Sequence, residues 1–271
     1  MMPFLMRSRT ESAVYFEQQV ELTRTLEFVD EYNAANITPI SIFPIILWAT
    51  VQTCAERPEL NRFTAGDKLW QRRGIWCSYV VKKSMSDDAG LATMKREFDP
   101  SMSFDQVVAC MQTDKKSGRS DDKSHVDKEL GLLLKLPGPL LRLGVRLIRL
   151  FDFYGKLPRS FIDPDPMFAS AFFANLGSLQ MGSAYHHLYE YGNCPIFCVI
   201  GDIQDTPVVE DGKVVVRKCV KMRWSYDERI HDGFYAGSAL KALQAKIEDP
   251  KAAGAQIAVT DRSARGAGVA Q

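Results

Sequence analysis

Ionisable residues are most concentrated in the segment Tyr226-Asp227-Glu228-Arg229-Ile230-His231-Asp232-Gly233, where Glu228, His231 and Asp232 are the candidates for proton transfer. Glu228, His231 and Asp232 fall between a run of strand composition and an amphipathic helix. A strand-to-helix junction suits catalysis because the scaffold fixes the side chains while one end stays open. The segment therefore predicts acid–base chemistry. The alternative is an ordinary helix start, with Asp232 as N-cap and a surface ion pair between Glu228 and Arg229.

Composition limits the kind of protein that can carry this segment. The chain has 271 residues, of which 46% are hydrophobic and 25% are charged, as in an ordinary globular protein with a sizeable core. Lysine and arginine number 34 against 33 acidic residues, so no global field exists to gather nucleic acid. No apolar run is long enough to span a bilayer, and the N-terminus lacks the order of a secretory signal. These features predict a soluble, cytoplasmic protein without a nucleic-acid partner.

The six cysteines lie mostly in apolar surroundings, which predicts buried, reduced thiols. Cys194 and Cys198 are the only close pair, and no second pair of ligands accompanies them. We therefore expect neither a metal site nor a disulfide framework.

The hydrophobic patterns predict a mixed α and β chain. In the first half they indicate a strand over 12–22, helices over 23–33 and 41–55, a strand hairpin within 68–83, and a polar loop or helix start over 114–129 that contains His125. In the second half they indicate strands over 167–176, 195–203, 214–220 and 222–226, a closing helix over 234–248, and a flexible tail over 251–271. Asp211-Gly212 lies between β-branched runs, which is the strongest hairpin signal in the chain.

Residues 139–153 form a predicted amphipathic helix, with Arg142, Arg146 and Arg149 on one face and leucines around the rest. Such a helix can lie on a membrane or bind a partner. Packing against the same or a neighbouring subunit is the favoured interpretation, so we expect no membrane association and keep 139–153 as a candidate surface for a protein partner.

Four sequence motifs occur in the order typical of one known family. They are RPELNRF (57–63), ANLGS (174–178), PVVEDGKVVVRK (207–218) and YDERIHDG (226–233). With them the chain resembles, over roughly residues 15–250, the catalytic core of the dihydrolipoyl acyltransferases of 2-oxoacid dehydrogenase complexes, and more distantly chloramphenicol acetyltransferase.

The resemblance implies a two-layer α/β (α+β) domain of the chloramphenicol acetyltransferase-like fold that forms homotrimers. It also implies coenzyme A as the cofactor and an active-site channel at each subunit interface. The family's base is the histidine of an Asp-His-Arg-x-x-Asp-Gly motif, and a Ser or Thr before Asn-Leu-Gly stabilises the oxyanion.

This sequence departs from the family at both catalytic positions. Glu228 stands at the histidine position, and Ala174, before Asn175, stands where the hydroxyl is expected. His231 lies three residues beyond the motif position. His186 and His187, in a segment that runs near the interface in the relatives, offer a relocated base or a trimer contact.

Two functions follow as expectations for residues 1–250, the predicted catalytic-core domain. The first is a coenzyme A-dependent acyltransferase with a non-standard site, taking its acyl group from acyl-CoA, since the resemblance begins almost at the N-terminus and predicts a free-standing core. The second is a catalytically inactive trimeric scaffold or binding protein that kept the fold and lost the chemistry.

Overall fold

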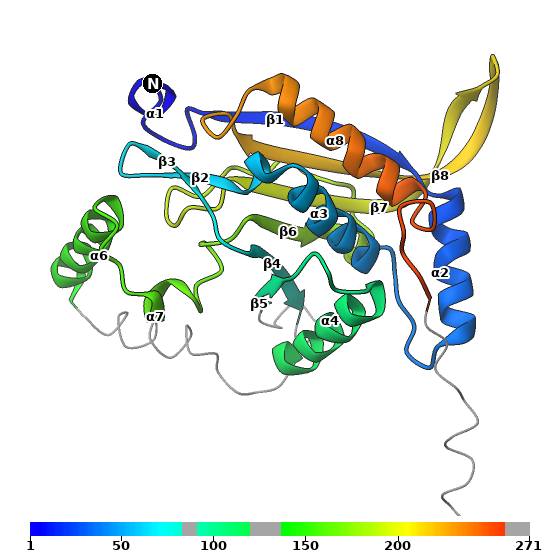
Figure 1. The fold of residues 1–271 in the computed structure, drawn as a ribbon, viewed down its shortest axis with the longest axis horizontal. Coiled ribbons are helices and arrows are strands. Elements are labelled where there is room, and N and C mark those ends of the chain that lie inside the picture. The colour runs from blue at the N-terminus through cyan, green and yellow to red at the C-terminus, as the bar shows by residue number, and fades with distance from the viewer. Residues whose placement is uncertain (83–90, 120–136, 258–271) are drawn as a thin grey trace, which may run out of the picture.

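A computed structural model describes residues 1–82, 91–119 and 137–257. Its main feature is a six-stranded mixed sheet in the order β1-β8-β7-β6-β4-β5, in which β6 runs parallel to both β4 and β7 and the other pairs are antiparallel (Figure 1). The strands are β1 (Ala13–Glu21), β4 (Ile75–Lys82), β5 (Leu91–Phe98), β6 (Ala171–Asn175), β7 (Ile196–Glu210) and β8 (Lys213–Asp227). A second sheet consists of β2 (Arg62–Ala65) and β3 (Lys68–Gln71).

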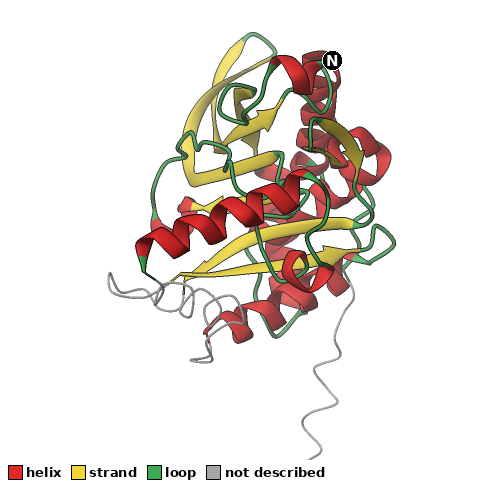
Figure 2. Cartoon of the chain, turned by 90° about the vertical axis from the view of Figure 1, so that its left-hand side faces the viewer, coloured by secondary structure: helices red, strands yellow, loops and turns green. Residues whose placement is uncertain are grey.

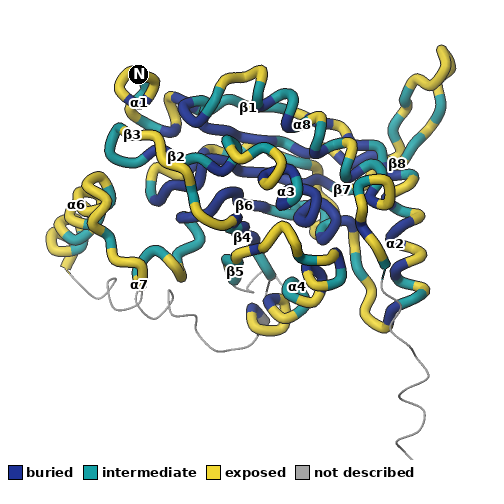
Figure 3. Tube along the Cα trace, in the orientation of Figure 1, coloured by how far each residue is buried: buried dark blue, intermediate teal, exposed yellow. Residues whose placement is uncertain are grey.

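Four helices cover one face of the sheet and enclose the main core (Figures 1 and 3). They are α2 (Thr23–Ala35), α3 (Phe43–Glu56), α4 (Phe104–Arg119) and α8 (Gly233–Glu248). Ten of the fourteen residues of α3 are buried, as its nearly uninterrupted apolar sequence predicts. The predicted two-layer α/β class is therefore confirmed.

The opposite face of the sheet carries a smaller apolar cluster that includes Phe172, Phe197 and Leu188. The short turn η2 (Leu176–Leu179) and residues 180–195 contribute Leu176, Leu188 and Cys194 to this cluster. Figure 2 shows the molecule from the left of Figure 1, with long loops between its helices and strands. The remaining short or peripheral helices are α1 (Met2–Leu5), the 3-10 turn η1 (Pro58–Asn61), α6 (Gly138–Phe153) and α7 (Arg159–Ile162).

The hairpin predicted within 68–83 is wrong. β3 pairs with β2 through a turn at Gly66-Asp67, whose φ angles of 59° and 55° supply the left-handed conformation that a tight hairpin needs. β4 instead enters the main sheet between β5 and β6. The runs 214–220 and 222–226, predicted as two strands, form the single strand β8. The register shift at this point is taken up in the partner strand β7, between Ile200 and Ile203.

Two boundaries also differ from expectation. Residues 114–119 complete α4 rather than form a loop, and buried Asp114 joins the helix to the sheet by accepting hydrogen bonds from Arg96 and Tyr79. Residues 251–257 fold back so that Ala255 is buried in the main core, and packed chain therefore continues beyond 250. His125 and residues 258–271 lie outside the described residues.

The hairpin at Asp211-Gly212 is confirmed, with φ of 49° and 76° at the two turn residues. All six cysteines are free, and all but Cys110 are buried. In the described parts of the chain no helix is both long and apolar enough to cross a membrane.

Candidate functional site

The segment that the sequence singled out begins where β8 ends, at a fully buried carboxylate. Asp227 is 0% exposed and accepts hydrogen bonds from the Ser12 hydroxyl (2.9 Å) and from the Arg229 side chain through Nε (2.8 Å) and Nη2 (2.7 Å). Arg229 also donates to the Met6 carbonyl oxygen at 3.1 Å. The expected surface pair between Glu228 and Arg229 is therefore wrong, because Arg229 turns inward and neutralises Asp227.

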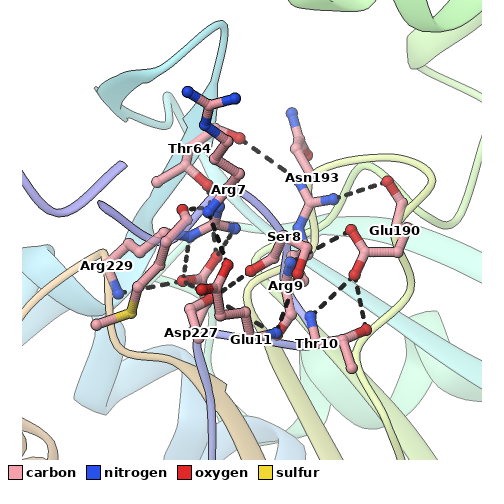
Figure 4. A network of polar contacts seen from close by, with 12 residues as sticks. Arg7, Ser8, Arg9, Thr10, Glu11, Thr64, Glu190, Asn193, Asp227 and Arg229 are labelled. Atoms are coloured by element: carbon pink, nitrogen blue, oxygen red, sulfur yellow. Dashed lines mark hydrogen bonds and ion pairs between the residues drawn. The ribbon is translucent and has the colours of Figure 1, made fainter. Parts of the chain in front are cut away.

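A second buried arginine joins this network from the N-terminal segment. Arg9 donates through its guanidinium to the carbonyl oxygens of Tyr189 (3.2 Å) and Glu190 (3.1 Å) (Figure 4). The Glu190 carboxylate in turn accepts hydrogen bonds from the backbone N–H groups of Arg9 and Thr10 and from the Thr10 hydroxyl (2.7 Å). Residues 7–12 are thus fastened both to the end of β8 and to the loop at 189–190.

A hollow of about 370 Å³ opens beside this network. Four arginines and three acidic residues take part in its wall, from the N-terminal segment, the β2–β3 turn, α6 and the loop at 190–192. The lining residues are Pro3, Arg7, Arg9, Thr64, Ala65, Gly66, Asp67, Ile148, Arg149, Asp152, Phe153, Glu190, Tyr191, Gly192 and Arg229. Arg9 and Arg229 are held by protein acceptors, whereas Arg7 and Arg149 are exposed and form no ion pair within the described residues. Two guanidinium groups are therefore available to an anionic ligand.

His231 lies on the other side of the motif, in an aromatic setting. Its ring stacks on that of Tyr226, with centroids 4.9 Å apart and planes at 21°, and lies 4.7 Å from the ring of Tyr235. Its Nδ1 is 3.2 Å from the Asp232 carbonyl oxygen and 3.1 Å from the Tyr226 hydroxyl, which itself donates to the His231 carbonyl oxygen. The ring is half-buried, and desolvation lowers its pKa.

The contacts of Nδ1 fit one tautomer of the neutral His231 ring. Both neighbouring carbonyl oxygens are satisfied when Nδ1 donates to the Asp232 carbonyl and the Tyr226 hydroxyl donates to the His231 carbonyl, since a carbonyl oxygen is an acceptor only. The lone pair is then on Nε2, which is buried and has no hydrogen-bond partner among the described residues. A neutral imidazole with a free Nε2 lone pair has the form of a general base.

Glu228 is half-buried directly after β8, where its backbone N–H donates to the Ser12 carbonyl oxygen at 3.0 Å. Burial, together with the nearby carboxylates of Glu228 and Asp227, raises the pKa of Tyr226. The hydroxyl of Tyr226 therefore stays protonated and keeps its hydrogen bond to the His231 carbonyl.

Asp232 has a defined structural role. Its Oδ1 accepts a hydrogen bond from the Tyr235 backbone N–H at 2.8 Å, which makes it the N-cap of α8. The capped-helix interpretation of this residue is confirmed.

The other candidates lie on the opposite face of the sheet. Successive side chains of a strand point to opposite faces. Tyr226 packs toward α8, whereas its neighbour Ser225 donates to the His186 carbonyl oxygen on the side of the smaller cluster. The His186 ring stacks on Phe197 with centroids 4.0 Å apart, and on His187 at 4.6 Å. Within one chain, His186 and His187 are thus separated from His231 by the sheet.

Ala174 and Asn175 end β6 near this second set. Ala174 packs against the smaller cluster, and the Asn175 side chain accepts a hydrogen bond from the Ser178 backbone N–H, which caps η2. The residues that the sequence proposed therefore fall into two groups, one at the start of α8 and one on the other face of the sheet.

Sequence reasoning missed the N-terminal contribution. Ser12, Arg9 and Arg7 lie before β1 in a short polar run that shows no periodicity, so no local pattern connects them with Asp227. Only the pairing of strands could have located them. β1 pairs with β8 so that Ala13 lies opposite Asp227, which brings the residues before Ala13 to the end of β8. Among the described residues no three His, Cys, Asp or Glu side chains gather as a metal ion would require.

Comparison with known proteins bears on the same segments. Residues 173–255 match the family described as 2-oxoacid dehydrogenases acyltransferase (catalytic domain). A dihydrolipoyllysine-residue succinyltransferase component of the 2-oxoglutarate dehydrogenase complex from Cupriavidus necator is 47% identical over 47 residues, which are 17% of this chain and 11% of that protein. The match thus spans about a tenth of that relative's length.

Two solved structures are similar over nearly the whole chain. A probable dihydrolipoamide acetyltransferase from Listeria monocytogenes has a TM-score of 0.64 at 17% identity, covering 95% of this chain and 94% of that one. The cubic core of a pyruvate dehydrogenase multienzyme complex has a TM-score of 0.63 at 18% identity, covering 89% and 83%. The resemblance and the fold inferred from the four motifs are confirmed.

Proposed function

Because this chain has the fold of the 2-oxoacid dehydrogenase acyltransferase cores and residues 173–255 match their catalytic domain, we propose that it is a coenzyme A-dependent acyltransferase with a non-standard base. The acyl donor is acyl-CoA and the acceptor carries a thiol or hydroxyl group. The observation that carries the proposal is the state of His231, a neutral imidazole whose Nε2 lone pair has no partner among the described residues.

In the proposed reaction Nε2 of His231 removes the proton from the acceptor as its sulfur or oxygen attacks the acyl carbonyl carbon. The tetrahedral intermediate then collapses, the bond to the coenzyme A sulfur breaks, and the proton returns from Nε2 to that thiolate. The Asp232 carbonyl oxygen holds the ring in the required tautomer throughout. Nε2 is buried in the structure, so the proposal requires a local movement that exposes it to the acceptor.

The hollow beside Arg229 is the proposed site for the phosphates of the coenzyme. It adjoins the motif through Arg229, and the exposed guanidinium groups of Arg7 and Arg149 suit phosphate oxygens. Replacing Arg149 with Gln should therefore raise KM for acyl-CoA while leaving kcat nearly unchanged.

Two variants test the base. A thiol-release assay with an acyl-CoA panel should show kcat/KM of His231→Gln reduced about 10²- to 10⁴-fold, the usual contribution of a positioned base. Glu228→Gln should lose much less. Full activity in His231→Gln would overturn the assignment, and a loss confined to Glu228→Gln would move the base to the residue at the family's histidine position.

A homotrimer is part of the proposal. The resemblance implies a channel between subunits, and the separation of His231 from Ala174 by the sheet fits a site shared between neighbours. The aromatic group around His186, with Tyr185 51% and Tyr189 36% exposed, has the composition of an interface. Sedimentation at micromolar concentration should give three times the 30.5 kDa chain mass, and a clean monomer would contradict it.

One observation favours the second candidate, an inactive trimeric scaffold. Ala174 has no hydroxyl to donate to an oxyanion, and such a donor is worth about 10²- to 10³-fold in rate. A scaffold would assemble normally, show no acyl-CoA turnover, and be insensitive to His231→Gln.

A further inference from the structure

Helix α6 is attached to the rest of the protein along a single edge. None of its sixteen residues is buried, and it projects from the sheet at the left of Figure 1. Its half-buried residues Leu141, Gly144, Ile148 and Asp152 fall on one side of a helix that turns about 100° per residue, and two of them line the hollow. The C-terminal end of α6 lies directly against the β2–β3 turn. Gly66 allows this close approach, because a Cβ added there would lie 2.1 Å from the Phe153 carbonyl oxygen.

A second side of α6, turned about 110° from the half-buried one, is a continuous apolar strip. Its members fall within an arc of about 100°, and each is between 43% and 52% exposed. They are Leu140, Leu143, Leu147, Leu150 and Phe151. An exposed contiguous apolar surface of this kind marks a binding face.

Basic side chains border this strip along its whole length. Arg142, Arg146 and Arg149 fall within an arc of about 60° next to the leucines, and none of them forms an ion pair within the described residues. The single acidic residue of the helix, Asp152, is on the side that faces the hollow, and Arg149 also reaches the hollow, which leaves Arg142 and Arg146 as the basic side chains of the outward surface. The outward surface of α6 is therefore apolar and positively charged, without an acidic group.

The area of the strip indicates which kind of partner can cover it. A helix of 16 residues is about 24 Å long, and a strip about 10 Å wide gives roughly 240 Å². A stable protein–protein interface needs about 800 Å² on each partner, so the strip alone is too small for a second copy. A bilayer surface has no such requirement, because a basic amphipathic helix lies in it with its apolar face between the headgroups.

In contrast to the expectation from the sequence, we propose that α6 docks the protein on the surface of an anionic phospholipid bilayer, with the five apolar residues among the acyl chains and Arg142 and Arg146 at the phosphates. Helix α1 borders the same hollow through Pro3 and exposes Phe4 and Leu5 by 66% and 62%, which adds apolar surface near α6. This inference is independent of catalysis, since it requires neither acyl-CoA nor His231.

Vesicle flotation with the full chain tests the proposal. At low salt the protein should float with phosphatidylcholine vesicles containing 30% phosphatidylserine, and at least tenfold less with phosphatidylcholine alone or in 0.5 M NaCl. Leu143→Asp/Leu147→Asp and, separately, Arg142→Gln/Arg146→Gln should each reduce binding tenfold or more. Circular dichroism checks that both variants are folded.

Matched controls come from the β7–β8 hairpin, where Val209 and Val216 are 72% and 66% exposed. Val209→Asp/Val216→Asp and Lys213→Gln/Lys218→Gln make the same changes elsewhere and should leave binding unaltered. The proposal is overturned if wild-type protein ignores anionic vesicles at low salt. It is also overturned if the α6 variants bind vesicles as well as the wild type does. A third contradicting result is a change of sedimenting mass in the α6 variants when no form of the protein binds vesicles, which would identify a second copy of the chain as the partner of α6.

Discussion

Removing the guanidinium of Arg229 should be among the most damaging single changes to the stability of this protein. Figure 4 shows its ion pair with Asp227. Asp227 is completely buried, and Arg229 itself is 8% exposed. Arg229→Gln leaves the carboxylate with the Ser12 hydroxyl and the backbone N–H of residue 229 as its close donors. Removing one partner of a buried pair costs about 3–5 kcal/mol, and the buried Arg9, which interacts with the Asp227 charge, places the expected loss toward the lower end of this range.

The structure also predicts how a second change should act. Asp227→Asn removes the charge that Arg229→Gln leaves unpaired, so the double variant should be less destabilised than the sum of the two single variants. A positive coupling of at least about 1 kcal/mol would fit a desolvated pair in contact. Arg24→Gln, which breaks the exposed pair with Asp249, is the matched control and should leave stability unchanged within error.

Urea unfolding at a fixed protein concentration measures these differences through tryptophan fluorescence, since Trp48 and Trp224 are both buried. In a thermal scan the Arg229→Gln loss corresponds to about 6–20 °C, at about 2–4 °C per kcal/mol for a chain of this size. A loss below about 1 kcal/mol, or strict additivity in the double variant, would refute the view that this pair anchors the end of β8.

Three further predictions concern single groups. Asp232→Ala should destabilise the protein by about 1 kcal/mol, because it removes the N-cap of α8. Asp232→Asn keeps a capping oxygen and should retain both stability and turnover. A large loss of activity in the Asn variant would instead assign Asp232 a chemical role. Burial lowers the pKa of His231 and of His186, so folding disfavours their charged forms. The free energy of unfolding should therefore be level above pH 6.5 and fall as the pH drops below it. Urea midpoints measured from pH 5 to 8 should show this fall in the wild type and a smaller one in His231→Gln. Burial raises the pKa of Cys54 to about 12 and that of the buried Cys198 too, so a disulfide reagent at pH 8 should modify native protein at Cys110 alone; rapid reaction of several thiols would contradict the described packing.

Much of the fold could be predicted from local sequence patterns. Strand β1, helices α2, α3 and α8, and the Asp211-Gly212 hairpin all have strong local signals, either a clear hydrophobic period or turn residues that accept left-handed angles. The pairing of β3 was missed because Gly66-Asp67 and Gly74 are both glycine turns, and no local feature says which of them closes the hairpin.

The candidate site was predictable in part. The sequence identified the junction after β8 and the capping role of Asp232, because both depend on near neighbours. It could not assign the partner of Arg229, since the choice between Glu228 and Asp227 depends on which side chain the pairing of β1 with β8 buries. The tautomer of His231 depends on contacts between Tyr226, the turn and the cap that only the folded chain supplies.

Calorimetric titration with acetyl-CoA and coenzyme A, beside a thiol-release assay, tests the central claim most directly. The account predicts binding in the micromolar range and a turnover that His231→Gln lowers about 10²- to 10⁴-fold. Absence of binding at millimolar coenzyme would contradict it, and the protein would then be a scaffold that keeps the acyltransferase fold without its cofactor.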